Sequence, residues 1–173
     1  MKYFPIDNSL FVINRKKFIA KMKNNSVAFF NSNDKYPVSA DTTLPFEQHR
    51  DLFYLTGINQ EETILVLFKE NEKVSKQVVF LTKPNDLLTH WEGARLNKKN
   101  AYSISGISEV YWLGEMEKII EKLLNENTSL YINQNEHYRA KVETETREDR
   151  FTNWLKNKYN FKNFERSNPI LQN

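Results

Sequence analysis

The residues best suited to chemistry in this chain are its three histidines, His49, His90 and His137. They are spread far apart, and none stands at the short spacing, such as His-x-x-x-His, by which one element presents two metal ligands. Histidines isolated in this way, in loops and at helix ends, are more often exposed to solvent than bound to a metal. We therefore expect no metal site built from these side chains.

Other residue patterns that carry catalysis are equally weak. The four glycines are scattered, which excludes a phosphate-binding loop and a dinucleotide fingerprint. No serine sits in a Gly-x-Ser-x-Gly turn, although a Ser-His-Asp triad assembled by the fold remains open. The acids Glu61–Glu62 and Glu143–Glu145 resemble surface carboxylates. Because the chain has no cysteine, disulfides, thiolate nucleophiles and cysteine-ligated zinc are excluded. The residues alone therefore indicate no autonomous active site.

The stretch HWEGARLN combines an indole, a glycine and a guanidinium within five positions. It is either a helical turn that buries Trp91 or a recognition loop that displays it. In a helix, Arg95 would lie on the same face as Trp91, and we expect it to form a salt bridge with Glu92 or Asp86. Spacing alone leaves burial and display open.

The composition limits the classes of protein to which the chain can belong. A chain of 173 residues is most simply one domain with a single core. The net charge of +3 comes from interspersed acids and bases, without the basic stripe of a nucleic-acid-binding protein. No apolar run is long enough for a membrane helix, and the start, MKYFPIDNSLF, lacks the apolar core of a signal peptide. We therefore expect a cytoplasmic protein without nucleic-acid or membrane partners.

The spacing of apolar residues predicts amphipathic helices. Phe18, Ile19 and Met22 share one face of the first, with Asn14 as its N-terminal cap. The predicted helices span 14–23, 115–127 and 148–159, and a further one begins near 85.

Runs of β-branched and aromatic residues between turn formers predict strands. We expect Phe53 and Tyr54 in the core, with Arg50 and Asp51 as an ion pair where their strand begins. The predicted strands span 26–31, 53–57, 62–69, 77–82, 109–113 and 129–133. Strands alternating with helices predict an α/β layered domain with a central mixed β-sheet flanked by helices.

The connection between the first two predicted strands is long and polar. Pro37 and Pro45 argue against regular structure inside it. Long connections of this kind are often functional.

Two stretches, taken in order, resemble one known family. The first is SADTTLPFEQHRDLFYLTGINQEETILVLF at 39–68, similar to a pattern that leads into Asp-Phe-Tyr-Tyr-Leu-Thr-Gly. The second is THWEGARLNKKNAYSISGI at 89–107, where the family shows Trp-x-Gly-x-Arg, then a helix and Gly-Ile or Gly-Val. Both resemble the N-terminal domain of Xaa-Pro aminopeptidase (aminopeptidase P), a domain shared more loosely with prolidase and creatinase. The resemblance extends from about residue 12 to 170.

Two positions depart from the family pattern. This sequence has Leu44 where the family usually has an aromatic residue before Pro45. It has Gln60-Glu61-Glu62 in place of the usual Glu-Pro after the glycine-containing turn.

The resemblance implies the creatinase/aminopeptidase P N-terminal domain fold and an activity that lies elsewhere. Members of the family carry a following catalytic domain of pita-bread fold, where two Asp, one His and two Glu hold two divalent metals, often manganese. A metal-bridging hydroxide there attacks the carbonyl before proline. This chain shows no counterpart of those ligands. We therefore expect residues 1–173 to form a single N-terminal domain, without metal or catalytic residue of its own, of a larger metallopeptidase.

The family also implies a role in substrate access and subunit packing. In its oligomeric members a tryptophan and an aspartate of this domain line the active-site entrance of a neighbouring subunit, and they match Trp91 and Asp41. Arg166, near the expected junction, would reach the active site of the intact enzyme. The implied partners are a peptide with proline at its second position and further copies of the chain. On this interpretation Gly93 turns the chain so that Trp91 faces outward.

Alternatives remain at each level. Trp91 could pack under its own helix, and Asp41 could cap a turn. The whole protein could instead be a prolidase, which prefers dipeptides, because the N-terminal motifs discriminate poorly. The chain could also be a stand-alone binding or oligomerisation module that uses the same fold without catalysis.

Overall fold

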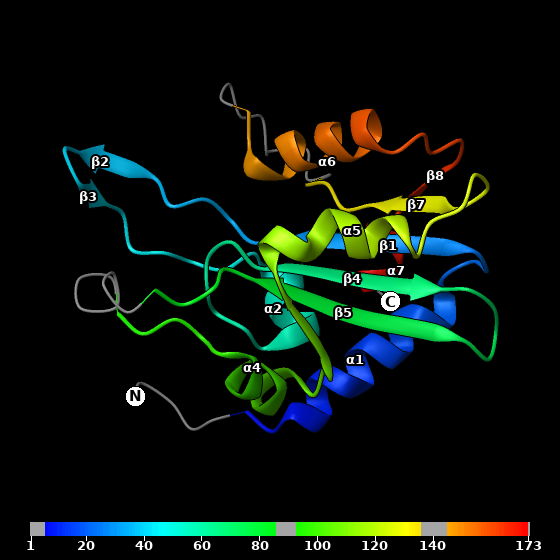
Figure 1. Cartoon of the computed structure of the whole chain (residues 1–173), viewed down its shortest axis with the longest axis horizontal. Coiled ribbons are helices and arrows are strands. Elements are labelled where there is room, and N and C mark those ends of the chain that lie inside the picture. Colours follow the sequence, from blue (N-terminus) through cyan, green and yellow to red (C-terminus); the bar gives the residue numbers. More distant parts are fainter. Residues whose placement is uncertain (1–5, 86–92, 136–144, 173) are drawn as a thin grey trace.

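A six-stranded sheet with helices on both faces forms the body of the protein (Figure 1). The computed structural model describes residues 6–85, 93–135 and 145–172. In the sheet β4 is antiparallel to β1 and β5, whereas the other neighbouring pairs are parallel, which confirms the predicted mixed sheet. The strands, in spatial order, are β6 (Glu109–Trp112), β5 (Ser75–Leu81), β4 (Ile64–Lys69), β1 (Ser26–Asn31), β7 (Ser129–Ile132) and β8 (Phe164–Arg166).

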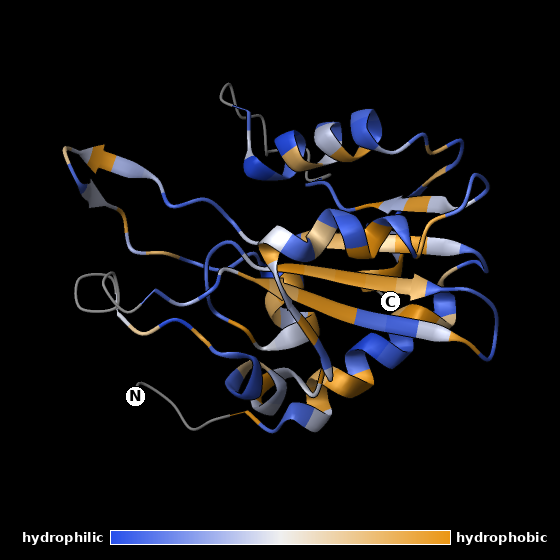
Figure 2. Ribbon diagram, in the orientation of Figure 1, coloured by the Kyte–Doolittle hydropathy of each residue, from blue (hydrophilic) through white to orange (hydrophobic). Residues whose placement is uncertain are grey.

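The central strands are buried on both faces. All six residues of β1 and all six of β4 are buried, as expected for strands covered on two sides. Because successive side chains point to opposite faces, Ala28 and Phe30 enter one core while Val27 and Phe29 enter the other. Figure 2 shows these strands as the most hydrophobic part of the ribbon.

The helices form the two outer layers. The first core is covered by α1 (Asn8–Lys21), α2 (Arg50–Thr56), α4 (Lys98–Ser105) and the short α7 (Asn168–Leu171). The second core is covered by a 3-10 turn, η1 (Leu113–Glu115), with α5 (Met116–Glu121) and α6 (Arg147–Lys158). Figure 1 shows α5 and α6 on the opposite side of the sheet from α1 and α4. The predicted α/β layered class is therefore confirmed.

The predicted strand over 53–57 is wrong, because residues 53–56 belong to the helix α2 and Gly57 is its C-terminal cap. Leu52 and Leu55 are fully buried and lie three positions apart, which is the spacing of one helical face. Tyr54 points outward and is 45% exposed, so it is not a core residue. The tertiary packing of the two leucines outweighs the strand preference of the aromatic residues between them.

The first helix begins earlier than the periodicity predicts. Its cap is Asp7, whose side chain accepts a hydrogen bond from the Ser9 amide. Asn14, expected as the cap, is buried within the helix and donates to the Tyr54 carbonyl at 2.9 Å. Asparagine is common both as a helix cap and as a buried side chain that bonds to a neighbouring helix, so the sequence alone does not separate the two roles.

Other boundaries also differ from prediction. The helix expected over 115–127 is confined to α5, and the predictions did not include β8 or α7. The helix that the family resemblance implied before Gly-Ile is present as α4, followed by Gly106 and Ile107.

Arg15 joins three elements around the matching ends of α2 and α4. In each helix a hydroxyl (Thr56 or Ser105) accepts from the isoleucine amide two residues later, across a glycine with positive φ. The fully buried Arg15 guanidinium donates to the Leu55 carbonyl at 2.6 Å and the Ser105 carbonyl at 2.8 Å. Its Nε donates to the Gln77 side chain on β5 at 2.7 Å. Burial lowers the pKa of Arg15 to about 10, so the group remains cationic at neutral pH.

Candidate functional site

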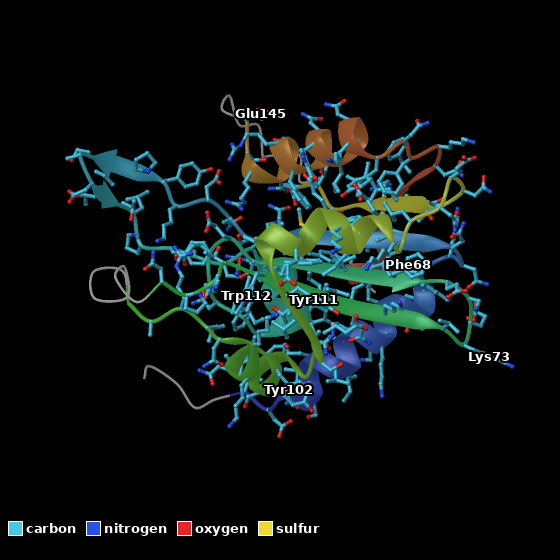
Figure 3. The ribbon with its side chains drawn as sticks, in the orientation of Figure 1. Phe68, Lys73, Tyr102, Tyr111, Trp112 and Glu145 are labelled. Carbon is cyan, nitrogen blue, oxygen red and sulfur yellow. The ribbon has the colours of Figure 1, made fainter. Side chains whose placement is uncertain are left out.

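Two of the expected site residues, Asp41 and Arg166, belong to elements that leave or end at one edge of the sheet. The parallel strands β1, β5 and β7 all end there, and β4 begins there. The carboxyl edge of such a sheet is where α/β proteins usually bind ligands. Long segments leave this edge after β1, β5 and β7 (Figure 1). The opposite edge carries the tight turn between β4 and β5, where Figure 3 labels Lys73.

The segment after β1 projects from the body as an arm, which we define as residues 33–47. Its two short strands, β2 (Pro37–Ser39) and β3 (Thr42–Thr43), pair only with each other and form a separate sheet. Figure 1 shows the arm extending away from the main sheet. The predicted irregular connection therefore contains a hairpin.

Asp41 lies in the turn at the tip of the arm and is exposed. The residue before it, Ala40, has a φ of 51°, a left-handed conformation that closes the turn. Three large apolar side chains of the arm are also about half exposed: Tyr36, Val38 and Leu44. An acid beside exposed apolar groups, held away from the body, can contact a molecule that approaches this edge.

The root of the arm is held by ion pairs on two sides. Asp34 contacts Arg150 at 2.6 Å and Arg147 at 3.4 Å, both on α6. Lys35 contacts Glu61, in the loop between α2 and β4, at 2.9 Å. Asn33 donates to the Glu47 carbonyl at 3.0 Å and so joins the two ends of the arm.

Glu61 and Glu62 are not the plain surface acids that the sequence indicated. Both bind Arg95, from Glu61 to Nη2 and from Glu62 to Nη1, each at 3.3 Å. Glu62 also accepts from the Thr82 hydroxyl at 2.6 Å. Burial raises the pKa of Glu61, but the hydrogen bond and charge of Lys35, with Arg95 adding, outweigh it and leave this pKa below its usual value.

The segment 93–97 is fixed to the same loop. The Leu96 amide donates to the buried Gln60 side chain at 2.7 Å, next to the contacts that Arg95 makes. Gly93 has a φ of 86° and nothing within 4 Å of the position of an added Cβ. Gly93 therefore has the left-handed backbone conformation that glycine permits, and the expected sharp turn at this residue stays a prediction. Trp91 lies outside the described residues, so its expected outward orientation stays a prediction.

Other expected residues also fall outside the described ranges. These are His90, His137, Glu143 and both acids proposed as partners for Arg95, Asp86 and Glu92.

His49 lies in a polar cluster, and the expectation that it is exposed to solvent is wrong. Its side chain is 20% exposed, and Nε2 lies 3.1 Å from the Glu148 carboxylate on α6. Its Nδ1 accepts from the Asp51 amide at 3.3 Å and so caps α2. Burial lowers the pKa of His49, but the hydrogen bond and charge of Glu148, with Asp51 adding, outweigh it and raise the pKa above its usual value.

The same cluster holds the start of the segment that follows β7. Asn133 donates to Asp51 at 3.1 Å and to Glu148 at 3.3 Å, and the Asn135 amide donates to Glu148 at 2.8 Å. Asp51, expected to pair with Arg50, thus faces His49 and Asn133 instead. The sequence signal was weak, because a histidine followed two residues later by an acid is also a common surface pattern.

Arg166 ends the edge strand β8 and is exposed. Its register partner is Ile132, at the end of β7, so it lies at the carboxyl edge of the sheet. Asp41 lies on the arm and Arg166 on the last strand of the sheet, so the two come from different elements of this edge.

Within residues 6–85, 93–135 and 145–172, no group of three or more His, Cys, Asp or Glu is placed to hold a metal ion. No helix in the described part of the chain is long and apolar enough to cross a membrane.

Comparison with known protein families decides which family this fold represents. A family model described as the N-terminal domain of aminopeptidase P matches residues 11–131. The chain belongs to the aminopeptidase P N-terminal domain family. The matched region includes the two stretches, 39–68 and 89–107, that carried the resemblance in the sequence. The match confirms that the resemblance is to this family.

Individual relatives agree with the family. Xaa-Pro aminopeptidase of Haemophilus influenzae is 33% identical over 117 residues, which cover 68% of this chain and 27% of the relative. Xaa-Pro aminopeptidase of Escherichia coli is 30% identical over 129 residues, covering 74% and 29%. The structure of Escherichia coli aminopeptidase P in a low-pH form shares the fold, with a TM-score of 0.80 at 23% identity over 97% of this chain and 38% of that one. The chain therefore spans less than two fifths of the length of these relatives.

Proposed function

We propose that this domain is the non-catalytic N-terminal part of a Xaa-Pro aminopeptidase, which releases the N-terminal residue preceding proline. The relatives with this name are the support for the activity. The described residues offer no group of three or more metal ligands, so we assign the bond-breaking step to another part of the protein. Two divalent metals, manganese by family resemblance, would there activate the attacking water and polarise the carbonyl.

The role that we propose for this domain is to border the entrance for the peptide and to contact other subunits of a homo-oligomer. The observation that carries this proposal is the arm, which holds the exposed Asp41 away from the body beside exposed apolar side chains. An exposed carboxylate can accept a hydrogen bond from a peptide or pair with its positive charge. Trp91 would supply an indole face for a proline or a downstream side chain. We place Arg166 at the same entrance and the protein in the cytoplasm.

Kinetics of the full-length protein test this role. Asp41→Ala should raise KM for peptides of four or more residues about three- to tenfold, the worth of one hydrogen bond, and leave a minimal Xaa-Pro substrate unaffected. Trp91→Ala should also weaken activity on the longer peptides while hardly changing the melting temperature. The control is Thr42→Ala, a neighbouring exposed position on the arm.

Two results would contradict the role. Equal effects of Asp41→Ala on long and minimal substrates would remove Asp41 from the entrance. A loss of several kcal/mol of stability in Trp91→Ala would mean that the indole is a core residue. A prolidase would instead show little activity on peptides longer than two residues, whichever variant is tested.

A further inference from the structure

The arm is joined to the body by ion pairs of two consecutive residues, Asp34 and Lys35. Its strands β2 and β3 pair only with each other, and its side chains from Tyr36 to Leu44 are exposed. Such a hairpin has no buried core of its own and cannot hold its direction by packing. The contacts that can fix the position of Asp41 therefore lie at the root of the arm, where Asp34 and Lys35 pair with residues of the body.

Asp34 and Lys35 anchor the root to different elements. Asp34 reaches the two arginines of α6, in the layer that covers the second core. Lys35 reaches Glu61, in the loop that follows α2, in the layer that covers the first core. The two ion pairs therefore hold the root between two different elements, the loop after α2 and the helix α6.

The acids of both ion pairs are shielded from solvent. The side chains of Asp34 and Glu61 are 20% and 18% exposed. Ion pairs in such positions are screened less than those between fully exposed side chains, and two arginines on one carboxylate form a network. Their basic partners are more exposed, up to 48% for Arg150, so the restraint comes from several pairs acting together on one root.

Glu61 has a second contact that extends the restraint. The oxygen that binds Lys35 also binds Arg95, in the segment 93–97. One carboxylate thus links the root of the arm to the chain that follows Trp91 in the sequence. Where the family pattern has Glu-Pro, this chain has Gln60-Glu61-Glu62, so this link lies in a stretch where the sequence departs from the pattern.

We propose that Glu61 and Asp34 are positioning residues that aim the arm, and with it Asp41, by holding its root between the α2–β4 loop and α6. The inference rests on the proposed function at one point, which is that the arm borders the peptide entrance. Glu61 touches no substrate and acts through Lys35 and Arg95.

A distance measurement tests the restraint directly. The 173-residue chain has no cysteine, so Val38→Cys on the arm and Lys99→Cys on α4, both exposed, carry two spin labels at defined places. We expect a narrow distribution of label distances in this background. Glu61→Gln and Asp34→Asn should each widen it at least twofold, and 1 M salt should widen it in the parent as well, because the Debye length falls to about 3 Å.

The matched control is Glu117→Gln, which removes a comparable ion pair, of 2.8 Å to Lys158, between α5 and α6. It should leave the distribution unchanged. Circular dichroism melts would establish that each variant is folded at the temperature of measurement. Unchanged widths in both folded variants, Glu61→Gln and Asp34→Asn, would overturn the proposal.

Kinetics of the full-length protein separate this inference from the proposed function. Glu61→Gln should raise KM for the longer peptides about threefold or more, with kcat on a minimal substrate unchanged. If Asp41→Ala has no effect on long peptides while Glu61→Gln widens the distances, the entrance role is wrong and the positioning role stands. If Asp41→Ala raises KM while Glu61→Gln alters neither distances nor KM, the positioning role is wrong.

Discussion

At the scale of single residues, His49 shows how one side chain can join two segments of the candidate site. Its Nδ1 caps α2 by accepting from the Asp51 amide, while Nε2 faces Glu148 on α6. Protonation of Nδ1 ends the capping bond and makes that nitrogen a donor, 3.8 Å from the Asp51 carboxylate. The charged form of His49 is stabilised by two nearby carboxylates, Asp51 and Glu148, whereas the neutral form keeps the capping hydrogen bond.

This cluster predicts a dependence of stability on pH. Since the pKa of His49 is raised in the folded protein, protonation stabilises the fold, fully below the unfolded value near 6.5. That contribution is lost as pH rises through the raised pKa. His49→Asn retains a capping side chain but cannot titrate. The free energy of unfolding should therefore favour the wild type over His49→Asn more at pH 5.5 than at pH 8.5.

Urea unfolding across this pH range measures the difference, and an NMR titration of His49 gives its pKa directly. Glu148→Gln should lower that pKa, because it removes the nearest negative charge. A difference between wild type and His49→Asn that does not change with pH would show that the pair contributes no proton-linked stability.

At the scale of elements, the glycines that end α2 and α4 occupy positions where a side chain would not fit without strain. Gly57 and Gly106 both have positive φ, and a Cβ at Gly57 would overlap the Phe11 ring on α1. Close approach of α1 and α2 thus depends on the absence of a side chain. By contrast, Gly93 has positive φ in open space, and Gly114 meets nothing within 4 Å.

These differences predict a graded set of alanine variants. Gly57→Ala should cost about 2–4 kcal/mol, from left-handed strain plus overpacking against Phe11. Gly93→Ala should cost about 1–2 kcal/mol from strain alone, and Gly114→Ala should stay within about 0.5 kcal/mol of the wild type. Chemical denaturation of the three variants measures the series. Equal losses at Gly57 and Gly93 would mean that the ring moves aside without cost.

At the scale of the whole molecule, the body and the arm are built differently. The body encloses two cores around a sheet whose central strands are buried on both faces. The arm is an exposed hairpin held by ion pairs at its root. An exposed arm that projects from such a body is suited to contact another domain or subunit.

On the proposed function, we expect the 173-residue chain to be folded but inactive. It should show a cooperative thermal transition and no hydrolysis of a Xaa-Pro peptide, even with manganese added. The measurement is release of the N-terminal residue by chain purified free of host peptidases, with the full-length protein as positive control. Turnover that persists through further purification and copurifies with the chain would contradict our assignment of the metals to another part of the protein.

Much of the body was predictable from local patterns. The strands 26–31 and 62–69 are apolar on both faces, and only a central position in a covered sheet accommodates such runs. The family was predictable too, because FYLTG and WEGARL carry side chains whose identity and order are specific. The error at 53–57 arose because a short aromatic run has the composition of a strand, while its leucines three apart pack as one helical face.

By itself, the amino-acid sequence determined the layered α/β class, the family and the absence of cysteine chemistry, since periodicity and residue type are local properties. Only the tertiary structure decided which partners the charged side chains have. It placed Glu61 and His49, both expected at the surface, in contacts at the carboxyl edge of the sheet, and it gave Arg95 the partners Glu61 and Glu62. Ion pairs join residues distant in the chain, and their geometry exists only after the sheet has brought those segments together.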